Sequence, residues 1–147
     1  MTKQLTRQML EDMGIIDVHW DSESEHQWVI TRKWYYKKTK DMKITNPKIS
    51  YVRGKNKYTI PKIYRKVQFN YKGKGVAIPL GRFVYAWFKG DIPEGYDVDH
   101  INNCPFDNHL ENLQLLTREE NIRKRYVDNP EGCWNQYQAI KKYHKEI

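Results

Sequence analysis

The stretch that decides the fold is Tyr96–Arg125, which reads YDVDHINNCPFDNHLENLQLLTREENIRKR. It places an Asp-His pair, Asp99 and His100, at the end of an apolar stretch typical of a β-strand. A second short strand, LQLL, follows after a polar loop. Thr117 and Glu120 then form a capping box, which predicts that a helix begins there. The stretch therefore predicts a strand, a loop, a second strand and a helix, in that order.

The predicted helix has two distinct sides. Ile122 and Tyr126 are four residues apart and share one side, so we expect them to pack on the two strands. Asn121 and Arg125 share another side, with Lys124 beside them. This arrangement predicts that Asn121 faces outward from the first turn of the helix.

The polar residues of this unit have the chemistry of a phosphodiester hydrolase. Carboxylate and amide oxygens, as in Asp99 and Asn121, suit Mg²⁺, which keeps its other positions for water and phosphate. A histidine such as His100 is a natural proton acceptor near neutral pH. Neighbouring residues in a flat strand point to opposite faces. Asp99 and His100 can therefore serve one phosphate only at a bent strand end, which the polar loop permits.

At these residues the chain resembles the HNH endonucleases, also called ββα-metal or His-Me finger nucleases, in their phage and homing-endonuclease branch. The marks of the resemblance are the Asp99-His100 pair, the Glu-Asn-Leu at 111–113 and the Glu-Asn at 120–121. The lead-in, GRFVYAWFKGDIPEGYDVDHI, also resembles that branch, so the likeness runs from about residue 74 to 125.

The resemblance implies a role for each marked residue. His100 would be the general base that activates water, and Asn112 would tie the loop so that His100 is aimed correctly. Asp99 and Asn121 would bind one divalent ion per site, Mg²⁺ or Mn²⁺. Two positions depart from the commonest family pattern: Asn121 stands where the third letter of the name is often histidine, and Gly81 stands where the lead-in often has histidine.

Further polar residues near these marks are candidates for supporting roles. Asn108 and His109 lie in the loop and are candidates for supporting it. Basic side chains on the predicted helix are candidates for phosphate contacts, since they share the helix with a predicted metal ligand. These are Arg118, Arg123, Lys124 and Arg125.

The charge of the chain is concentrated in one block. Residues 32–74 contain 15 Lys or Arg and one acid, Asp41, so this block has a net charge of +14 within a chain whose total is +8. Eight aromatic residues are interleaved with these charges. A folded basic surface of this kind suits a polyanion, because each neutralised phosphate releases counterions. Nucleic acid is therefore favoured over a merely solvated lysine-rich surface.

Alternation of apolar and polar residues predicts that the basic block is an antiparallel sheet. Strands are expected near residues 27–36, from 49 and over 62–71, with a connection at 39–48 and a turn candidate at Gly54. The whole chain is predicted to be α+β in three parts. These are a basic β-rich DNA-binding region with an N-terminal helix (1–75), an HNH ββα-metal core (76–128) that includes a short helix at 81–90, and a C-terminal helix (129–147).

Composition excludes several classes of protein. The 147 residues include 39% hydrophobic and 14% aromatic residues, which argues against general disorder. We find no apolar run of membrane-spanning length and no signal-peptide core, which predicts a cytoplasmic protein of a bacterium or phage-infected host that has no membrane partner. Two cysteines cannot form a four-cysteine zinc site.

Three functions are left open by the sequence. The leading one is a divalent-metal-dependent endonuclease on double-stranded DNA, without a small-molecule cofactor. One such site cuts one strand, so cutting both strands would call for a homodimer. A catalytically silent DNA-binding protein on the same scaffold is the alternative, although it would not need all four marked residues. An interaction module, for instance an inhibitor of another nucleic-acid-binding protein, is disfavoured because a DNA mimic should be acidic.

Overall fold

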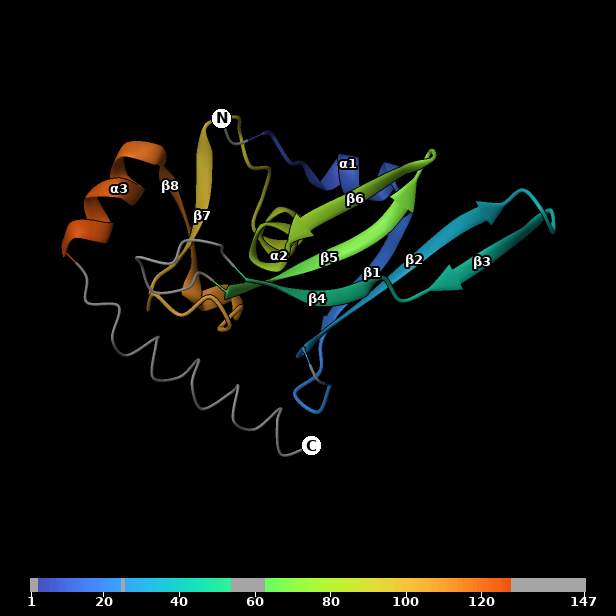
Figure 1. Ribbon diagram of the computed structural model, residues 1–147, viewed down its shortest axis with the longest axis horizontal. Helices are drawn as coiled ribbons and strands as arrows, with labels where there is room; N and C mark the ends of the chain where they lie inside the picture. Colours follow the sequence, from blue (N-terminus) through green and yellow to red (C-terminus); the bar gives the residue numbers. More distant parts are fainter. Residues whose placement is uncertain (1–2, 25, 54–62, 128–147) are drawn as a thin grey trace.

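The computed structural model describes residues 3–24, 26–53 and 63–127, and it confirms the mixed α+β class (Figure 1). Every sheet in this part of the chain is antiparallel. The elements in order are α1 (Arg7–Asp12), β1 (Ile15–Trp20), β2 (Trp28–Tyr36), β3 (Asp41–Thr45), β4 (Lys48–Arg53), β5 (Ile63–Tyr71), β6 (Lys74–Pro79), α2 (Leu80–Phe88), β7 (Tyr96–His100), the 3-10 turn η1 (Leu110–Asn112), β8 (Leu113–Thr117) and α3 (Arg118–Val127).

The first sheet has the strand order β1-β2-β3. The predicted connection at 39–48 was wrong over most of its length, because residues 41–45 form β3 and pair with β2 from Arg32 to Tyr36. Lys40 has a φ of 54° and so supplies the tight turn of this hairpin. Beyond Arg32, β2 no longer pairs with β1. The end of the hairpin is therefore a two-stranded ribbon that extends from the body of the molecule (Figure 1).

The second sheet has the strand order β4-β5-β6 and confirms the strands expected within the basic block. Val67 of β5 and Ile78 of β6 pair with each other and are buried on the core side. The turn candidate at Gly54 lies outside the described residues. Pro79 ends β6, and α2 begins at the next residue, consistent with proline at a strand end.

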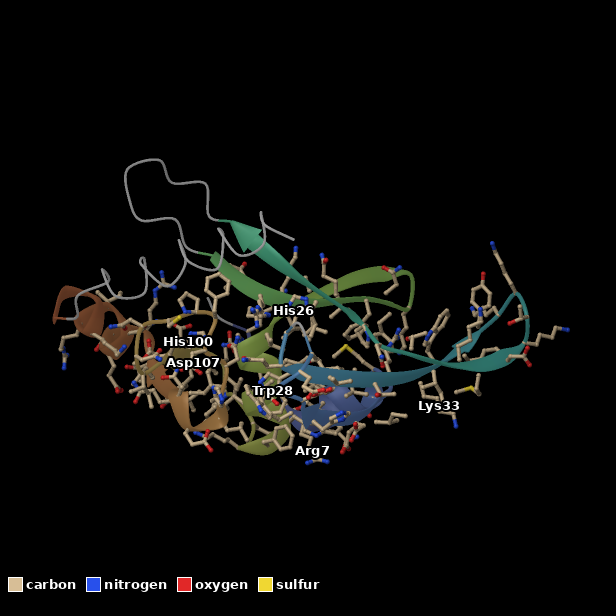
Figure 2. The ribbon with its side chains drawn as sticks, turned by 90° about the horizontal axis from the view of Figure 1, so that it is seen from below. Arg7, His26, Trp28, Lys33, His100 and Asp107 are labelled. Carbon is tan, nitrogen blue, oxygen red and sulfur yellow. The ribbon has the colours of Figure 1, made fainter. Side chains whose placement is uncertain are left out.

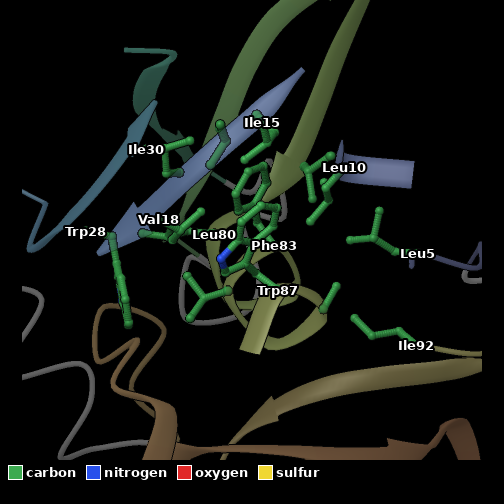
Figure 3. Packing of buried hydrophobic residues seen from close by; sticks show 14 of the residues in the cluster. Leu5, Leu10, Ile15, Val18, Trp28, Ile30, Leu80, Phe83, Trp87 and Ile92 are labelled. Atoms are coloured by element: carbon green, nitrogen blue, oxygen red, sulfur yellow. The ribbon is translucent and has the colours of Figure 1, made fainter. Parts of the chain in front are cut away.

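The short helix α2 lies at the centre of the hydrophobic core. Its residues Leu80, Phe83 and Val84 are fully buried. Figure 3 shows the side chains of the first sheet, among them Ile15 and Ile30, gathered around this helix. Because one helix contacts elements from both ends of the chain, the sheets and the unit that follows α2 are packed around a shared core.

The predicted order of strand, loop, strand and helix is observed at residues 96–127. β7 pairs with β8 from Tyr96↔Thr117 to His100↔Leu113, and α3 follows β8 directly. The capping box is confirmed, because the backbone N–H of Glu120 donates to the Thr117 hydroxyl at 3.2 Å. Two long side chains of α2 and its C-cap fasten the pair of strands: Arg82 donates to the Tyr96 carbonyl and Lys89 to the Leu113 carbonyl.

The hydrophobic cluster includes residues on both sides of the predicted boundary at 75/76, such as Ile30 and Phe83. The division into parts at 1–75 and 76–128 stays a prediction, and the expected C-terminal helix at 129–147 lies outside the described residues. Within the described part of the chain, none of the helices is long and apolar enough to span a membrane.

Candidate active site

The strand end at His100 bends into the loop, as the chemistry requires. Asn103 donates its backbone N–H to the His100 carbonyl at 2.9 Å, and its φ of 63° turns the chain sharply. The next residue after the strand, Ile101, donates to the carbonyl of Asn112 at 2.8 Å. The loop therefore starts and ends against the same strand pair, with Asp99 and His100 at its base.

His100 is held by one specific hydrogen bond. Its Nε2 lies 2.8 Å from Oδ1 of Asn108, a residue that is only 3% exposed. An amide oxygen can only accept, so Nε2 has the hydrogen and Nδ1 has the lone pair. Burial lowers the pKa of His100, although the hydrogen bond with Asn108 and the charges of Asp99 and Asp107 act in the opposite direction. The imidazole is thus kept neutral, which is the state in which it can accept a proton.

Asn108 is in turn fixed by a residue far away in the sequence. The indole Nε1 of Trp28, in β2, donates to the Asn108 carbonyl at 2.8 Å within the buried interior. The Asn108 amide nitrogen faces the carbonyl of Pro105 at 3.4 Å, which orients its oxygen toward His100. Sequence reasoning missed Trp28, since no local pattern marks a contact over 80 residues.

Gly81 also adjoins this histidine, and its role was missed. A Cβ at Gly81 would lie 3.2 Å from Oδ1 of Asn108 and 3.5 Å from Nε2 of His100. Gly81, which stands where the family often has histidine, therefore lies next to His100, the candidate general base. The family comparison of the lead-in was the signal that could have found it.

Asn112 connects three parts of the loop. Its Oδ1 accepts from the backbone N–H of Asn102 at 3.0 Å, and its Nδ2 donates to the carbonyl of Asp107 at 2.7 Å and to Oδ1 of Asn102 at 3.0 Å. These bonds cross the loop from end to end. Asn112 makes contacts of the kind expected of a residue that ties the loop.

The Asp99 carboxylate lies beside the ammonium group of Lys124. Its Oδ2 accepts from Gln114 at 2.9 Å and lies 3.1 Å from the ammonium of Lys124, on α3. Lys124 also donates to the His100 carbonyl at 3.2 Å and to Oδ1 of Asn103. Both side chains of the ion pair are largely buried, at 18% exposure for Lys124 and 12% for Asp99. Lys124 was expected to contact phosphate, but here it points into the site.

The orientation of α3 differs from the expected one. Ile122 is 42% exposed, so it does not pack on the strands as predicted. The side of the helix with Asn121 and Lys124 faces β7 instead, and Asn121 Nδ2 donates to Oδ2 of Asp97 at 3.2 Å. Asp97 and Asp99 are two residues apart in β7, so their side chains lie on the same face of the strand. Their carboxylates provide hydrogen-bond partners for Asn121 and Lys124, which an apolar side of α3 could not use.

The remaining candidate residues lie at the edge of the site or on the surface. Nδ1 of His109 is hydrogen-bonded to Oδ1 of Asp107 at 2.6 Å, and its ring lies against that of Trp20. Although burial raises the pKa of Asp107, hydrogen bonds from His109 and Asn102 outweigh it and lower that pKa. Figure 2 shows His100 and Asp107 together at this end of the molecule. Arg118 and Arg123 are exposed on α3, and the Arg125 side chain lies outside the described part.

The donor set fits a hard divalent cation. Three oxygens contact the Lys124 ammonium, from the Asp99 carboxylate, the His100 carbonyl and the Asn103 amide, so this oxygen cluster already accommodates a positive charge. Asn121 can present its amide oxygen from the adjacent helix, because its nitrogen faces Asp97. Among residues 3–24, 26–53 and 63–127, no group of three or more His, Cys, Asp and Glu side chains is arranged to hold a metal. A cation here would have water and phosphate as its other ligands.

A second basic surface is the end of the β2–β3 hairpin, residues 33–45, which we call the β2–β3 arm. All five residues of β3 are exposed. On one face of the arm, Tyr35, Met42 and Ile44 are between 53% and 66% exposed. On the other, the ammonium of Lys43 lies over the ring of Tyr36. Figures 1 and 2 show the arm, with Lys33 near its base, at the opposite end of the molecule from α3.

Comparisons with known proteins match the segment of the chain that contains the candidate site. Residues 80–123 match the family model of the HNH endonuclease. Over 65 residues the chain is 34% identical to YosQ of Bacillus subtilis (strain 168), an SPbeta prophage-derived protein whose name describes an inferred HNH homing endonuclease. That match covers 44% of this chain and 38% of the relative, so the chain spans well under half of the relative's length. No solved structure matches the chain. The resemblance to HNH endonucleases stated from the sequence is confirmed.

Proposed function

We propose that the protein is a divalent-metal-dependent DNA endonuclease with a ββα-metal core, because residues 80–123 match the family model of the HNH endonuclease. One observation supports this above the others. The imidazole of His100 is fixed through Nε2 by a buried amide, beside the Asp99 carboxylate at a bent strand end. In this neutral ring Nδ1 keeps its lone pair, so it can accept a proton.

The proposed reaction is hydrolysis of a phosphodiester. Nδ1 of His100 accepts a proton from a water molecule while the water oxygen forms a bond to phosphorus. The bond between phosphorus and the leaving oxygen breaks, and that oxygen takes a proton from solvent. Asn108 holds Nε2 during this step, and Asn112 holds the loop that surrounds it.

The metal ligands of the proposal are Asp99 and Asn121, one from β7 and one from α3. A bound Mg²⁺ or Mn²⁺ would stabilise the negative charge on the scissile phosphate and on the leaving oxygen. Asp97 supports Asn121 by accepting from its amide nitrogen, which turns the amide oxygen the other way. Gln114 supports Asp99 by donating its amide N–H to Oδ2 of that carboxylate.

The proposed substrate is double-stranded DNA, held in part by the β2–β3 arm. The arm contains Lys33, Lys37, Lys38, Lys40 and Lys43 against one acid, Asp41. A two-stranded ribbon has the width that the major groove admits, and lysines along it can neutralise phosphates. Arg118 and Arg123, exposed on α3, would contact the backbone nearer the site.

The test is conversion of supercoiled plasmid to nicked or linear DNA at low salt, with Mg²⁺ or Mn²⁺ and with EDTA. We expect metal-dependent cutting by the wild type and none by His100→Ala. His19→Ala is the matched control, because His19 also pairs with an aspartate at 2.6 Å but lies exposed on β1. Cutting that persists in His100→Ala at the wild-type rate would refute the proposed role of this residue.

A catalytically silent DNA-binding protein is the second candidate. The observation that favours it is that both proposed ligands are engaged within the protein, Asp99 with Lys124 and Asn121 with Asp97. In that case the wild type would shift labelled duplex DNA on a gel, and no metal would produce cutting.

A further inference from the structure

Lys124 is the feature of the site that the proposed function leaves unexplained. Its ammonium lies 3.1 Å from Oδ2 of Asp99 and 3.2 Å from the His100 carbonyl, and Asn103 provides a third oxygen. The side chain is 18% exposed, and the Asp99 side chain that it faces is 12% exposed. A lysine that serves only to attract phosphate would extend into solvent rather than be surrounded by oxygens.

The three acceptors resemble the coordination of an ion more than an ordinary surface pair. A carboxylate, a backbone carbonyl and an amide oxygen are the donor types that hard cations take in proteins. Here they converge on an ammonium, which is a compact point charge with three hydrogens to donate. The oxygen cluster at Asp99 is thus already neutralised by a residue of the same chain.

We propose that Lys124 is a built-in cation that occupies the oxygen cluster at Asp99 in the metal-free protein and that a divalent ion must displace it there. This inference rests on the proposed function, because it concerns the same metal ligand. An ammonium and a divalent ion cannot both contact Oδ2 of Asp99 without strong repulsion. When displaced, Lys124 can swing on its flexible stem toward the phosphate, since α3 holds its backbone next to the site.

The contact between Lys124 and Asp99 also helps α3 to dock on the strands. Without Lys124, the largely buried carboxylate of Asp99 would lie on the same face of β7 as that of Asp97 without the ammonium that now lies 3.1 Å away. Lys124 and Asn121 satisfy them from α3 before any metal arrives. The helix can therefore dock on the strands in the metal-free protein, and the site is formed in advance.

The main experiment measures Mn²⁺ binding to the full chain in the absence of DNA, by the electron paramagnetic resonance signal of free Mn²⁺. Lys124→Met keeps a long side chain and a good helix former but removes the charge. We expect it to bind Mn²⁺ about tenfold more tightly than the wild type, because a charge-assisted bond no longer competes for Asp99. Arg123→Met is the matched control: it removes one positive charge from an exposed neighbouring position of the same helix. We expect it to show only the smaller effect of a screened charge.

Thermal unfolding separates competition from a purely structural role. If Lys124 competes with the metal, Lys124→Met lowers the melting temperature of the metal-free protein, yet variant and wild type become nearly equal at saturating Mn²⁺. If Lys124 is only structural, the loss is the same with and without Mn²⁺, and the affinity for Mn²⁺ does not rise. That second pair of results would overturn the inference.

A measurement on the wild type keeps the inference testable if Lys124→Met does not fold. Reductive methylation followed by mass spectrometry reports how accessible each lysine amine is. We expect Mn²⁺ to speed the modification of Lys124 and to leave that of Lys89, which is bonded to the Leu113 carbonyl, unchanged. An equal modification rate for Lys124 with and without bound Mn²⁺ would overturn this inference and leave the proposed function standing. If neither the wild type nor Lys124→Met binds Mn²⁺, the proposed metal dependence fails and the inference with it.

Discussion

Replacing Asn108 with alanine removes the side-chain acceptor that holds His100 while it leaves the backbone bond from Trp28 in place. A buried donor without its partner costs about 1–3 kcal/mol, so the free energy of unfolding should fall by that amount. General-base catalysis contributes about 10²–10⁴-fold to the reaction rate, so impaired action of His100 can lower the cutting rate of the variant by no more than this factor. Because His100 remains but is no longer oriented, we expect a loss of about 10- to 100-fold.

The assay is single-turnover nicking of supercoiled plasmid at saturating Mn²⁺, with the melting temperature measured on the same preparations. Ile30→Val, in the core of β2 at 2% exposure, is the control for stability, since it should cost about 0.5–1.5 kcal/mol without touching the loop. Asn108→Asp restores an acceptor and adds a negative charge that raises the pKa of His100. Its rate should therefore exceed that of Asn108→Ala, and the acid limb of its pH–rate profile should move to higher pH. A rate for Asn108→Ala close to that of Ile30→Val would refute this reasoning.

Two further predictions concern the same neighbourhood. Burial lowers the pKa of His100 below the ordinary value of 6.5, so the unfolded chain binds a proton that the folded chain does not as the pH falls below that value. Between pH 7 and pH 5 the wild type should therefore lose more stability than His100→Gln; equal losses in calorimetry would contradict the burial of this ring. Gly81→Ala would place a Cβ 3.2 Å from Oδ1 of Asn108, which must shift by a few tenths of an ångström. Because alanine also favours the helix by up to about 1 kcal/mol, we expect little change in melting temperature but a slower nicking rate, and an unchanged rate would show that this contact is unimportant.

The local arrangement of the site was predictable because its signals are local. The apolar stretch before His100 and the short run LQLL predicted β7 and β8, and the pair Thr117 and Glu120 predicted where α3 begins. The polar loop predicted a bend after His100, which Asn103 provides. These features depend on neighbours within a few residues of one another, so the sequence alone determined them.

Other features depended on how separate elements pack, and only the tertiary structure decided them. Residues 41–45 form β3 where a connection was expected, because β3 gains its stability from pairing with β2 rather than from its own apolar pattern. The side of α3 that faces β7 is its polar side, with Asn121 and Lys124, and not the side with Ile122. The periodicity of apolar residues alone predicts that the side with Ile122 faces the strands.

The partners of buried polar groups are the clearest case of features that the sequence could not predict. The sequence identified Asp99, His100, Asn112 and Asn121 by their types and spacing, but Trp28 and Gly81, which adjoin Asn108 and His100, come from other elements. A buried donor or acceptor must find a partner wherever the packed layers bring one, and that partner can be 80 residues away. The sequence alone therefore determined which residues carry the chemistry, while the packing of β2, α2 and α3 decided what holds each of them in place.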